Sequence, residues 1–521
     1  MLRNSLSGMR RILWPLLLAL AALLFYILTL APTVLWGDDA YFQRTAFTGE
    51  LRPDGGGHWL WLQIARLFVQ LPVGDVAYRI NLLSAVAAAC TIFVLYGAAR
   101  EAGLRRDGAT VAVISLAVGH TFWMHAVRAE VYTLFTLFVA LHLWLWARWR
   151  PGQESAGNDL LHGARPLYLG AALSGITLLA HQMALFLALG WALLVLAHSA
   201  SLHRKQLAKA AVLFSLGLAP FFAVIYGQIV AVEQVSWLEA LRLYFTHAGS
   251  DFGPSFLNFA VATLPGDIAK WLAFTILQFG GPAIILVAWG IYDRLGGRLS
   301  PFWFALFAFY GIDALFSMSY GVNDRYVFLL PGYVALALFC GAGWQSARNE
   351  MSTRRVWMAR KSARRLAMVV CIFVLAATPV TAYYLAPRVM VALDINPMEI
   401  RRLPGRDPNH FFLWPGKGNY VGAREYGERT LAALPRGATL IADHTPFETL
   451  RYLQEVDGMR QDVLLIDIEP EDDLSELLEP LPDDAAIFLA DSNPAYYNLR
   501  SIPEASLAAR GPLYRLDLPA Q

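Results

Sequence analysis

Long apolar runs, separated by short polar connections, fill the chain up to about residue 387. About eleven of these runs reach the roughly 17–25 residues that a helix needs to cross a bilayer. They lie near residues 12–32, 80–99, 109–125, 130–148, 166–181, 183–199, 207–230, 269–292, 302–320, 326–344 and 366–387. The pattern therefore predicts a mostly α-helical, polytopic membrane protein with about eleven transmembrane helices.

The pattern changes after about residue 388, where charged residues, proline and glycine become frequent and the long apolar runs stop. Here the sequence predicts short strands and one helix. The strands lie at residues 439–442, 463–467, 486–490 and 513–518, and the helix at 446–454. Strands that alternate with helices are typical of a small α/β domain. We therefore predict a membrane domain over residues 1–387 and an α/β domain over residues 388–521.

The composition agrees with a membrane protein. Hydrophobic residues make up 57% of the 521 residues and charged residues 16%, whereas soluble domains carry about 25% charged residues. The net charge is +2 and no basic tract occurs, so nucleic acid is not an expected partner. The cysteines, Cys90, Cys340 and Cys371, lie inside apolar runs, which favours core positions over disulfides or a metal site.

Arginine and lysine clusters in the connections assign the two sides of the membrane, because these residues favour the cytoplasmic side. Clusters precede the first apolar run and follow the second, fourth, sixth, eighth and tenth. If the runs alternate in direction, every cluster lies on one side, which predicts a cytoplasmic N-terminus. The first opposite loop, residues 33–79, and the C-terminal domain then both lie on the extracytoplasmic side.

Asp38 and Asp39 are the strongest candidates for chemistry. They follow the first apolar run within Trp36-Gly37-Asp38-Asp39, and two carboxylates are costly to place at a membrane surface. Their mutual repulsion should raise one pKa toward the range that suits a general base. The alternative is that they only cap the start of a helix.

Further polar residues lie on the same predicted face. Those in the first loop are Asp54, His58 and Trp59, and those in later connections are Arg128, Glu130, His181, Asp324 and Arg325. Arginine suits phosphate because its guanidinium donates two parallel hydrogen bonds. Each residue also has a structural interpretation. Arg128 with Glu130 could form an ion pair, Arg325 a charge at the membrane edge, His181 a buried hydrogen-bonded group and Trp59 an interfacial anchor.

Five segments, taken in order, resemble the GT-C superfamily of polytopic glycosyltransferases. They are PTVLWGDD (residues 32–39), RINLLSA (79–85), VRAEVY (127–132), NDRYVFLLP (323–331) and YLQEVDG (452–458). The resemblance is closest to the protein O-mannosyltransferase-like branch, which includes an enzyme acting on plexin-type domains and bacterial relatives. One departure falls in the first loop, where Asp54 takes the place of the histidine in the branch's His-Pro-Pro-Gly-Tyr-Pro run and His58 is offset.

The resemblance implies an enzyme, a hexosyltransferase in a bacterial inner membrane. Such an enzyme takes a sugar, here a mannose-like hexose, from a polyprenyl phosphate and transfers it to an extracytoplasmic protein or glycan acceptor. The expected general base is Asp38, with Asp39 as the second choice. Arg128, Arg325 and His181 are the expected partners of the donor phosphate. The supporting residues are Glu130, Asp54, His58, Trp59 and Asp324. No cofactor is expected besides the lipid-linked donor, and a divalent metal is not favoured.

Two other functions stay open at this point. A transporter or flippase of a lipid-linked or polar substrate would use acids within the membrane, and Asp313 in the run 302–320 is such an acid. A scaffold would use the C-terminal domain to bind a partner. In an enzyme, the same domain would dock the acceptor. The sequence does not give the sugar, the lipid carrier, the acceptor or the stereochemistry.

Overall fold

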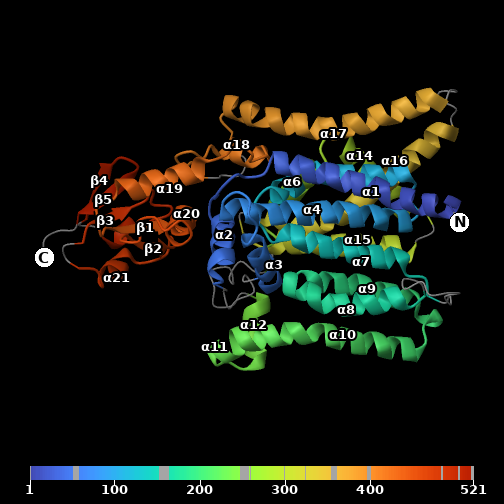
Figure 1. The fold of residues 1–521 in the computed structure, drawn as a ribbon, viewed down its shortest axis with the longest axis horizontal. Helices are drawn as coiled ribbons and strands as arrows, with labels where there is room; N and C mark the ends of the chain where they lie inside the picture. The colour runs from blue at the N-terminus through green and yellow to red at the C-terminus, as the bar shows by residue number, and fades with distance from the viewer. Residues whose placement is uncertain are drawn as a thin grey trace.

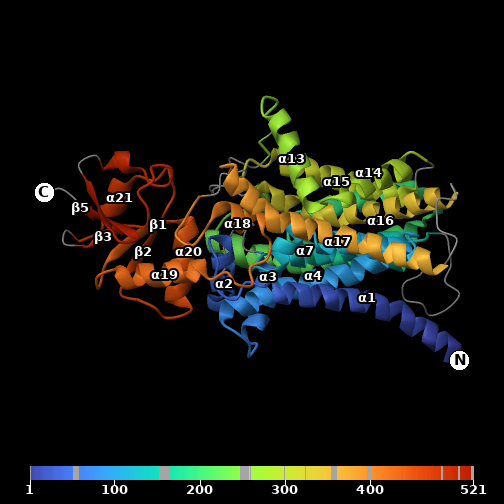
Figure 2. The ribbon, with the colours of Figure 1, turned by 90° about the horizontal axis from the view of Figure 1, so that it is seen from above.

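The computed structural model describes residues 2–50, 58–151, 163–246, 257–258, 260–297, 300–322, 324–353, 361–395, 401–482, 485–502 and 505–517. A bundle of roughly parallel helices forms the larger part of the molecule, and a small domain with a β-sheet lies at one end of it (Figure 1). The N-terminus lies at the other end of the bundle in both views (Figure 2).

The helices of the bundle coincide with the predicted apolar runs. They are α1 (Leu2–Leu28), α4 (Val76–Glu101), α5 (Arg106–Ala117), α6 (His120–Ala126), α7 (Tyr132–Arg148), α8 (Arg165–Ala180), α9 (Ala184–Ala197), α10 (Arg204–Ile225), α13 (Leu264–Gln278), α14 (Pro282–Leu295), α15 (Pro301–Ser319), α16 (Leu330–Thr353) and α17 (Lys361–Ala392). Within the described residues, five helices are long and apolar enough to cross a membrane, or up to seven if each bent pair counts as one span.

Two of the predicted runs are not single straight helices. The run 109–125 is divided into α5 and α6 with a bend of 67°, and the run 269–292 into α13 and α14 with a bend of 111°. Gly281 precedes α14 with φ +63°, which favours glycine, and Pro282 then starts the helix. The two breaks meet at Gln278, whose Oε1 accepts from the backbone N of Phe122 at 3.1 Å.

Shorter helices gather at the end of the bundle that faces the sheet domain (Figure 1). They are α2 (Asp38–Thr48), α3 (Trp59–Val69), α11 (Ala231–Glu233), α12 (Trp237–Thr246) and α18 (Pro408–Leu413). Phe412 and Leu413 of α18 belong to the apolar core of the bundle. The chain therefore returns to the bundle after α17 and before the sheet domain begins.

The C-terminal domain has a five-stranded sheet in the order β2-β1-β3-β5-β4. Its elements are α19 (Gly422–Ala433), β1 (Thr439–Asp443), α20 (His444–Glu455), β2 (Leu464–Ile468), α21 (Leu474–Leu478), β3 (Ile487–Leu489), β4 (Ser506–Arg510) and β5 (Leu513–Asp517). Strand β1 pairs in parallel with β2 and β3, whereas β5 runs antiparallel to β3 and β4. The four predicted strands and the predicted helix are confirmed, and β4 was missed.

The cysteine prediction is only partly correct. Cys340 of α16 is buried, but Cys90 and Cys371 are exposed on the surface of the bundle. An apolar run predicts burial in either protein or lipid, and the sequence does not separate the two.

Candidate active site

Asp38 and Asp39 are the first two residues of α2, and they face different surroundings. Successive residues of a helix differ by about 100° in direction. The Asp38 side chain is 59% exposed, whereas that of Asp39 is 4% exposed. The N-cap residue is Gly37, with φ +54°, so the helix-capping alternative is wrong in its simple form. Two negative charges in a first turn still favour the helix through its dipole.

Asp39 lies against Arg128, in the connection between α6 and α7. Asp39 Oδ1 is 3.6 Å from Arg128 Nε, and neither atom has a hydrogen-bond partner within the described part of the chain. Burial raises the pKa of Asp39 to about 6, although the charge of Arg128 acts in the opposite direction. Burial also works against the charge of Arg128, but Asp39 and Glu130 outweigh it and raise the pKa of Arg128.

Arg128 is fixed by two further contacts. Its Nη2 donates to Glu130 Oε1 at 3.0 Å and to His125 Nε2 at 3.2 Å. His125 can accept there because its Nδ1 lies 2.7 Å from the carbonyl oxygen of Thr121, which requires the proton on Nδ1. The guanidinium is therefore held in one orientation, with Nε turned toward Asp39. The predicted pair of Arg128 and Glu130 is present.

Two cations from the segment after α17 also act on Asp39, and the sequence did not predict them. Lys417 is 2% exposed, and its Nζ donates to the carbonyl oxygens of Phe411, Trp414 and Pro415 at 2.9, 2.7 and 3.2 Å. Burial, assisted by the charge of Arg128, lowers the pKa of Lys417 to about 7. Arg406 lies with its guanidinium 4.8 Å from the ring centre of Phe411. The available signal was a lone lysine in the glycine-rich segment WPGKG, residues 414–418.

Asp38 contacts the C-terminal domain. Its Oδ1 lies 3.0 Å from Nε2 of His444, the first residue of α20. Burial lowers the pKa of His444, but the hydrogen bond and charge of Asp38 outweigh this effect and raise it to about 9. The backbone N of Gly37 also donates to the carbonyl oxygen of Thr445 at 3.0 Å. No local pattern predicted this partner of Asp38, which lies 406 positions away in the chain.

Helix α20 contacts α2 at Arg44 as well as at Asp38. Arg44, which is 1% exposed, donates from Nε to Glu448 Oε2 at 3.0 Å and from Nη1 to Glu455 Oε2 at 3.1 Å. Thr449 Oγ1 donates to the carbonyl oxygen of Leu35 at 2.8 Å. The acid-bearing segment is therefore positioned by the C-terminal domain as well as by the bundle.

The other predicted residues are only partly brought together. Arg325 donates from Nη1 to Asp267 Oδ1 of α13 at 2.7 Å, so its main partner is an acid outside the Asp39 cluster. His181 is 3% exposed, and its Nδ1 accepts from the backbone N of Met183 at 3.2 Å. Its ring stacks on that of His58 at 4.9 Å. His181 therefore has the contacts of its structural interpretation, whereas Arg325 forms an ion pair with Asp267 that the sequence interpretation of a membrane-edge charge did not include.

Three supporting residues remain. Asp324 is close enough to Asp38 and Arg128 to interact electrostatically with both. Trp59 starts α3 and packs, partly buried, against the apolar core. Asp54 lies outside the described residues. In the part of the chain that is described, no group of three or more His, Cys, Asp or Glu residues is placed to hold a metal ion.

This chain is similar to known proteins both in sequence and in fold. The family model of the protein O-mannosyl-transferase TMEM260 N-terminal domain matches residues 55–204. The protein O-mannosyl-transferase TMEM260 of Mus musculus is 25% identical over 449 residues, which is 79% of this chain. The match covers 56% of the mouse protein, so this chain spans about half the length of that relative.

Solved structures match nearly the full length. ArnT from Cupriavidus metallidurans bound to undecaprenyl phosphate has a TM-score of 0.57 at 15% identity, covering 96% of this chain and 97% of that one. The chain has the GT-C glycosyltransferase fold. The oligosaccharyltransferase of Archaeoglobus fulgidus in its apo form has a TM-score of 0.52 at 13% identity, with coverage of 91% and 69%. The mycobacterial arabinofuranosyltransferase AftD has the same TM-score and identity, with coverage of 98% and 40%.

The GT-C resemblance predicted from the sequence is confirmed by the family match and by these neighbours. The predicted enzyme class, glycosyltransferase, agrees with the names of the mouse relative and of the structural neighbours, and it belongs to the function proposed below. The matched family domain contains Arg128 and Glu130, but it begins after Asp38 and Asp39 and ends before the C-terminal domain.

Proposed function

We propose that this GT-C chain transfers a mannose-like hexose from a polyprenyl phosphate to a hydroxyl group of an extracytoplasmic protein or glycan. The observation that carries the proposal is the pair of acids on α2, one exposed and one buried against Arg128. The name of the mouse relative, an O-mannosyl-transferase, supports the sugar and the hydroxyl acceptor. The undecaprenyl phosphate bound to ArnT supports the lipid carrier.

The proposed topology has eleven spans, a cytoplasmic N-terminus, a membrane domain over residues 1–387 and an extracytoplasmic domain over residues 388–521. The position of the N-terminus and the sheet domain at opposite ends of the bundle supports it (Figure 1). The contact between Asp38 and His444 supports the assignment of the acids and the C-terminal domain to one side. The two bent pairs each count as one span in this topology.

In the proposed reaction, Asp38 is the general base. An acceptor can reach an exposed carboxylate, whereas Asp39 would first have to leave its buried position. The acceptor oxygen attacks the anomeric carbon as its proton passes to Asp38. The bond between that carbon and the phosphate oxygen breaks, and its electron pair leaves with the polyprenyl phosphate. His444 orients Asp38 through its hydrogen bond.

Arg128 is the proposed partner of the leaving phosphate. Its charge is secured by Asp39 and Glu130, and its Nε–H has no acceptor among the described residues. A cation that is already oriented stabilises developing negative charge without rearrangement. Lys417 adds positive charge, but its three N–H groups donate to backbone carbonyl oxygens and are not available to the phosphate. Arg325 and His181 already have partners within the protein. In this proposal they line the donor site without binding the phosphate directly.

The transporter alternative loses its main support. Asp313 Oδ2 accepts from the backbone N of Gly332 at 3.1 Å, which ties α15 to α16 inside the bundle. This contact gives the acid a role in packing. No observation on the described residues favours transport over transfer.

The test compares a deletion strain with strains that carry the wild-type chain or the Asp38→Asn variant. Mass spectrometry of glycoproteins and glycolipids should show hexose additions that only the wild type restores. The purified wild-type protein should release polyprenyl phosphate from polyprenyl-phosphate mannose only when acceptor is present. Movement of the lipid-linked sugar across proteoliposomes without covalent transfer would instead establish a transporter.

A further inference from the structure

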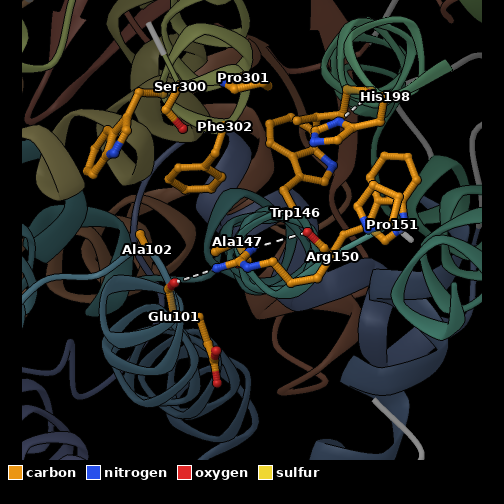
Figure 3. Close-up of a pocket in the computed structure, with 13 residues that line it drawn as sticks. Glu101, Ala102, Trp146, Ala147, Arg150, Pro151, His198, Ser300, Pro301 and Phe302 are labelled. Carbon is orange, nitrogen blue, oxygen red and sulfur yellow. Dashed lines mark hydrogen bonds between the residues drawn. The ribbon is translucent and has the colours of Figure 1, made fainter. Parts of the chain in front are cut away.

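A cavity of about 310 Å³ is lined by the residues drawn in Figure 3. The helix ends that carry them lie at the end of the bundle away from α2 and its acids (Figure 1). The cavity is enclosed by the C-terminal ends of α4, α7 and α9 and by the N-terminal end of α15. Cavities that bind small ligands start at about 300 Å³. The proposed transfer reaction does not involve this cavity. Aromatic rings and polar groups both line it.

Arg150 supplies the positive charge of the cavity. Its Nη1 donates to the carbonyl oxygens of Ala147 and, at 3.1 Å, of Trp149, and its Nη2 donates to that of Glu101 at 3.3 Å. Figure 3 shows the guanidinium extending between Phe302 and Glu101. A guanidinium carries five N–H donors. Two of them, on Nε and Nη2, have no acceptor among the contacts of the described residues.

The carboxylate in the wall does not cancel this charge. Glu101 Oε1 pairs at 3.1 Å with Arg148 Nη1, and Arg148 itself does not line the cavity. Among the described residues that line the cavity, the exposed Arg150 is therefore the charged group without an oppositely charged partner. A cavity with one such arginine favours an anionic ligand.

The neutral groups of the wall are also mainly donors. The indole nitrogens of Trp146 and Trp149, which are 1% and 3% exposed, have no acceptor within the described part of the chain. Ser300 is the N-cap residue of α15, yet its hydroxyl makes no capping bond there among the described residues. The first N–H groups of a helix have no partner within it and attract anions. His198 also lines the cavity, and its Nδ1 lies 2.9 Å from the carbonyl oxygen of Leu194, which leaves Nε2 as an acceptor. Most of the groups without a partner among the described residues of the wall are nevertheless donors, which favours a ligand that brings oxygen atoms.

We propose that this cavity binds the phosphate of an anionic lipid headgroup. Arg150 and the start of α15 would hold the phosphate oxygens, and a small rotation of the covered indoles would bring their N–H groups to the same ligand. Trp146, Trp149, Phe302 and Trp303 give the apolar contact that a glycerol backbone needs. Tryptophan is also typical of the headgroup depth of a bilayer. Inorganic phosphate offers the same charge without the apolar part, so the test separates the two.

The test uses the full-length, delipidated protein in detergent and native mass spectrometry. Phosphatidylglycerol is the anionic probe, phosphatidylcholine the zwitterionic probe and inorganic phosphate the soluble one. Retained phosphatidylglycerol should exceed phosphatidylcholine several-fold, and Arg150→Gln should lower its retention about tenfold. Trp149→Phe keeps the ring without its N–H and should lower retention about twofold, which provides a second measurement if the arginine variant does not fold.

Arg105→Gln is the matched control. Arg105 lies at the start of α5, on the same end of the bundle, is exposed, and does not line the cavity. This control should keep retention within about twofold of the wild type, because the Arg105 guanidinium donates to Asn349 at 3.1 Å and not into the cavity, and an exposed charge is screened by salt. Equal retention of the two lipids, equal losses in the two arginine variants, or displacement of the lipid by millimolar inorganic phosphate would each overturn the assignment.

Discussion

The two ends of the helix bundle hold their polar groups in different ways. At the end with the acids, charges are matched across elements that are far apart in the sequence, as in Asp38 with His444 and Asp39 with Arg128. At the other end, Arg150, Trp146 and Trp149 have N–H groups without an acceptor among the described residues. The comparison teaches that the first end orients its charges by ion pairs within the protein, whereas the second end leaves donors that suit the proposed anionic ligand.

The largest expected effect tests whether the acid end performs catalysis. Asp38→Asn should lower the rate of acceptor-dependent release of polyprenyl phosphate by about 10²–10⁴-fold, the contribution typical of a general base. The measurement is the initial rate with the purified protein in nanodiscs. Asp473→Asn is the control, because Asp473 is an exposed helix cap on α21. Full activity of Asp38→Asn together with an inactive Asp39→Asn would mean that the buried Asp39 is the general base instead of Asp38.

The second prediction tests the match between Asp39 and Arg128. Arg128→Lys keeps the charge but loses the fork of donors, and should lower the turnover about tenfold to a hundredfold. Arg325→Lys, whose partner is Asp267, should change turnover less than about threefold. The measurement is turnover at saturating donor. Equal losses in the two variants would mean that both arginines contact the phosphate.

The third prediction tests whether the C-terminal domain is needed to hold α2. Arg44→Met leaves Glu448, which is 5% exposed, without its buried partner, and should destabilise the protein by about 3–5 kcal/mol. Limited proteolysis and thermal unfolding should both report the loss. Arg451→Met, at a half-buried arginine of the same helix, should cost less than about 1 kcal/mol. Similar stability of the two variants would mean that the contacts of Arg44 with α20 do not hold the acid-bearing helix α2 in place.

The smallest expected effect is the pH dependence of the contact between Asp38 and His444. Because the pKa of His444 is raised to about 9, its stabilising contact is complete below the ordinary histidine pKa of about 6.5 and is lost as the pH rises through about 9. The difference in melting temperature between wild type and His444→Gln should therefore shrink between pH 6 and pH 9.5. A difference that stays constant over this range would mean that His444 is held by packing alone.

Local patterns in the sequence predicted the helices of the bundle, the four strands and the position of the acids. They missed β4, since its sequence Ser506–Arg510 is short, mostly exposed and lacks the alternation of a half-buried strand. They also missed the bends between α5 and α6 and between α13 and α14. An apolar run indicates that its residues avoid water, but it does not indicate whether the helix axis stays straight or bends.

The candidate site was predicted only where its residues are close to a motif. The resemblance supplied Asp38, Asp39, Arg128 and Glu130, each within a short matched segment. Lys417 and Arg406 reach Asp39 from a segment near the C-terminal domain, and no local pattern connects them with the first loop. Such pairings are set by the packing of the whole chain, so a single sequence does not reveal them.

The hydrogen bond between Asp38 and His444 joins parts of the polypeptide that leave the ribosome at very different times. On the proposed topology, residue 38 is exported early, and its partner follows 406 positions later. A nascent chain therefore holds the acid without the group that orients it. On the proposed function, transfer would begin only when translation and export of the C-terminal domain are finished, so incomplete copies would not consume the lipid-linked sugar.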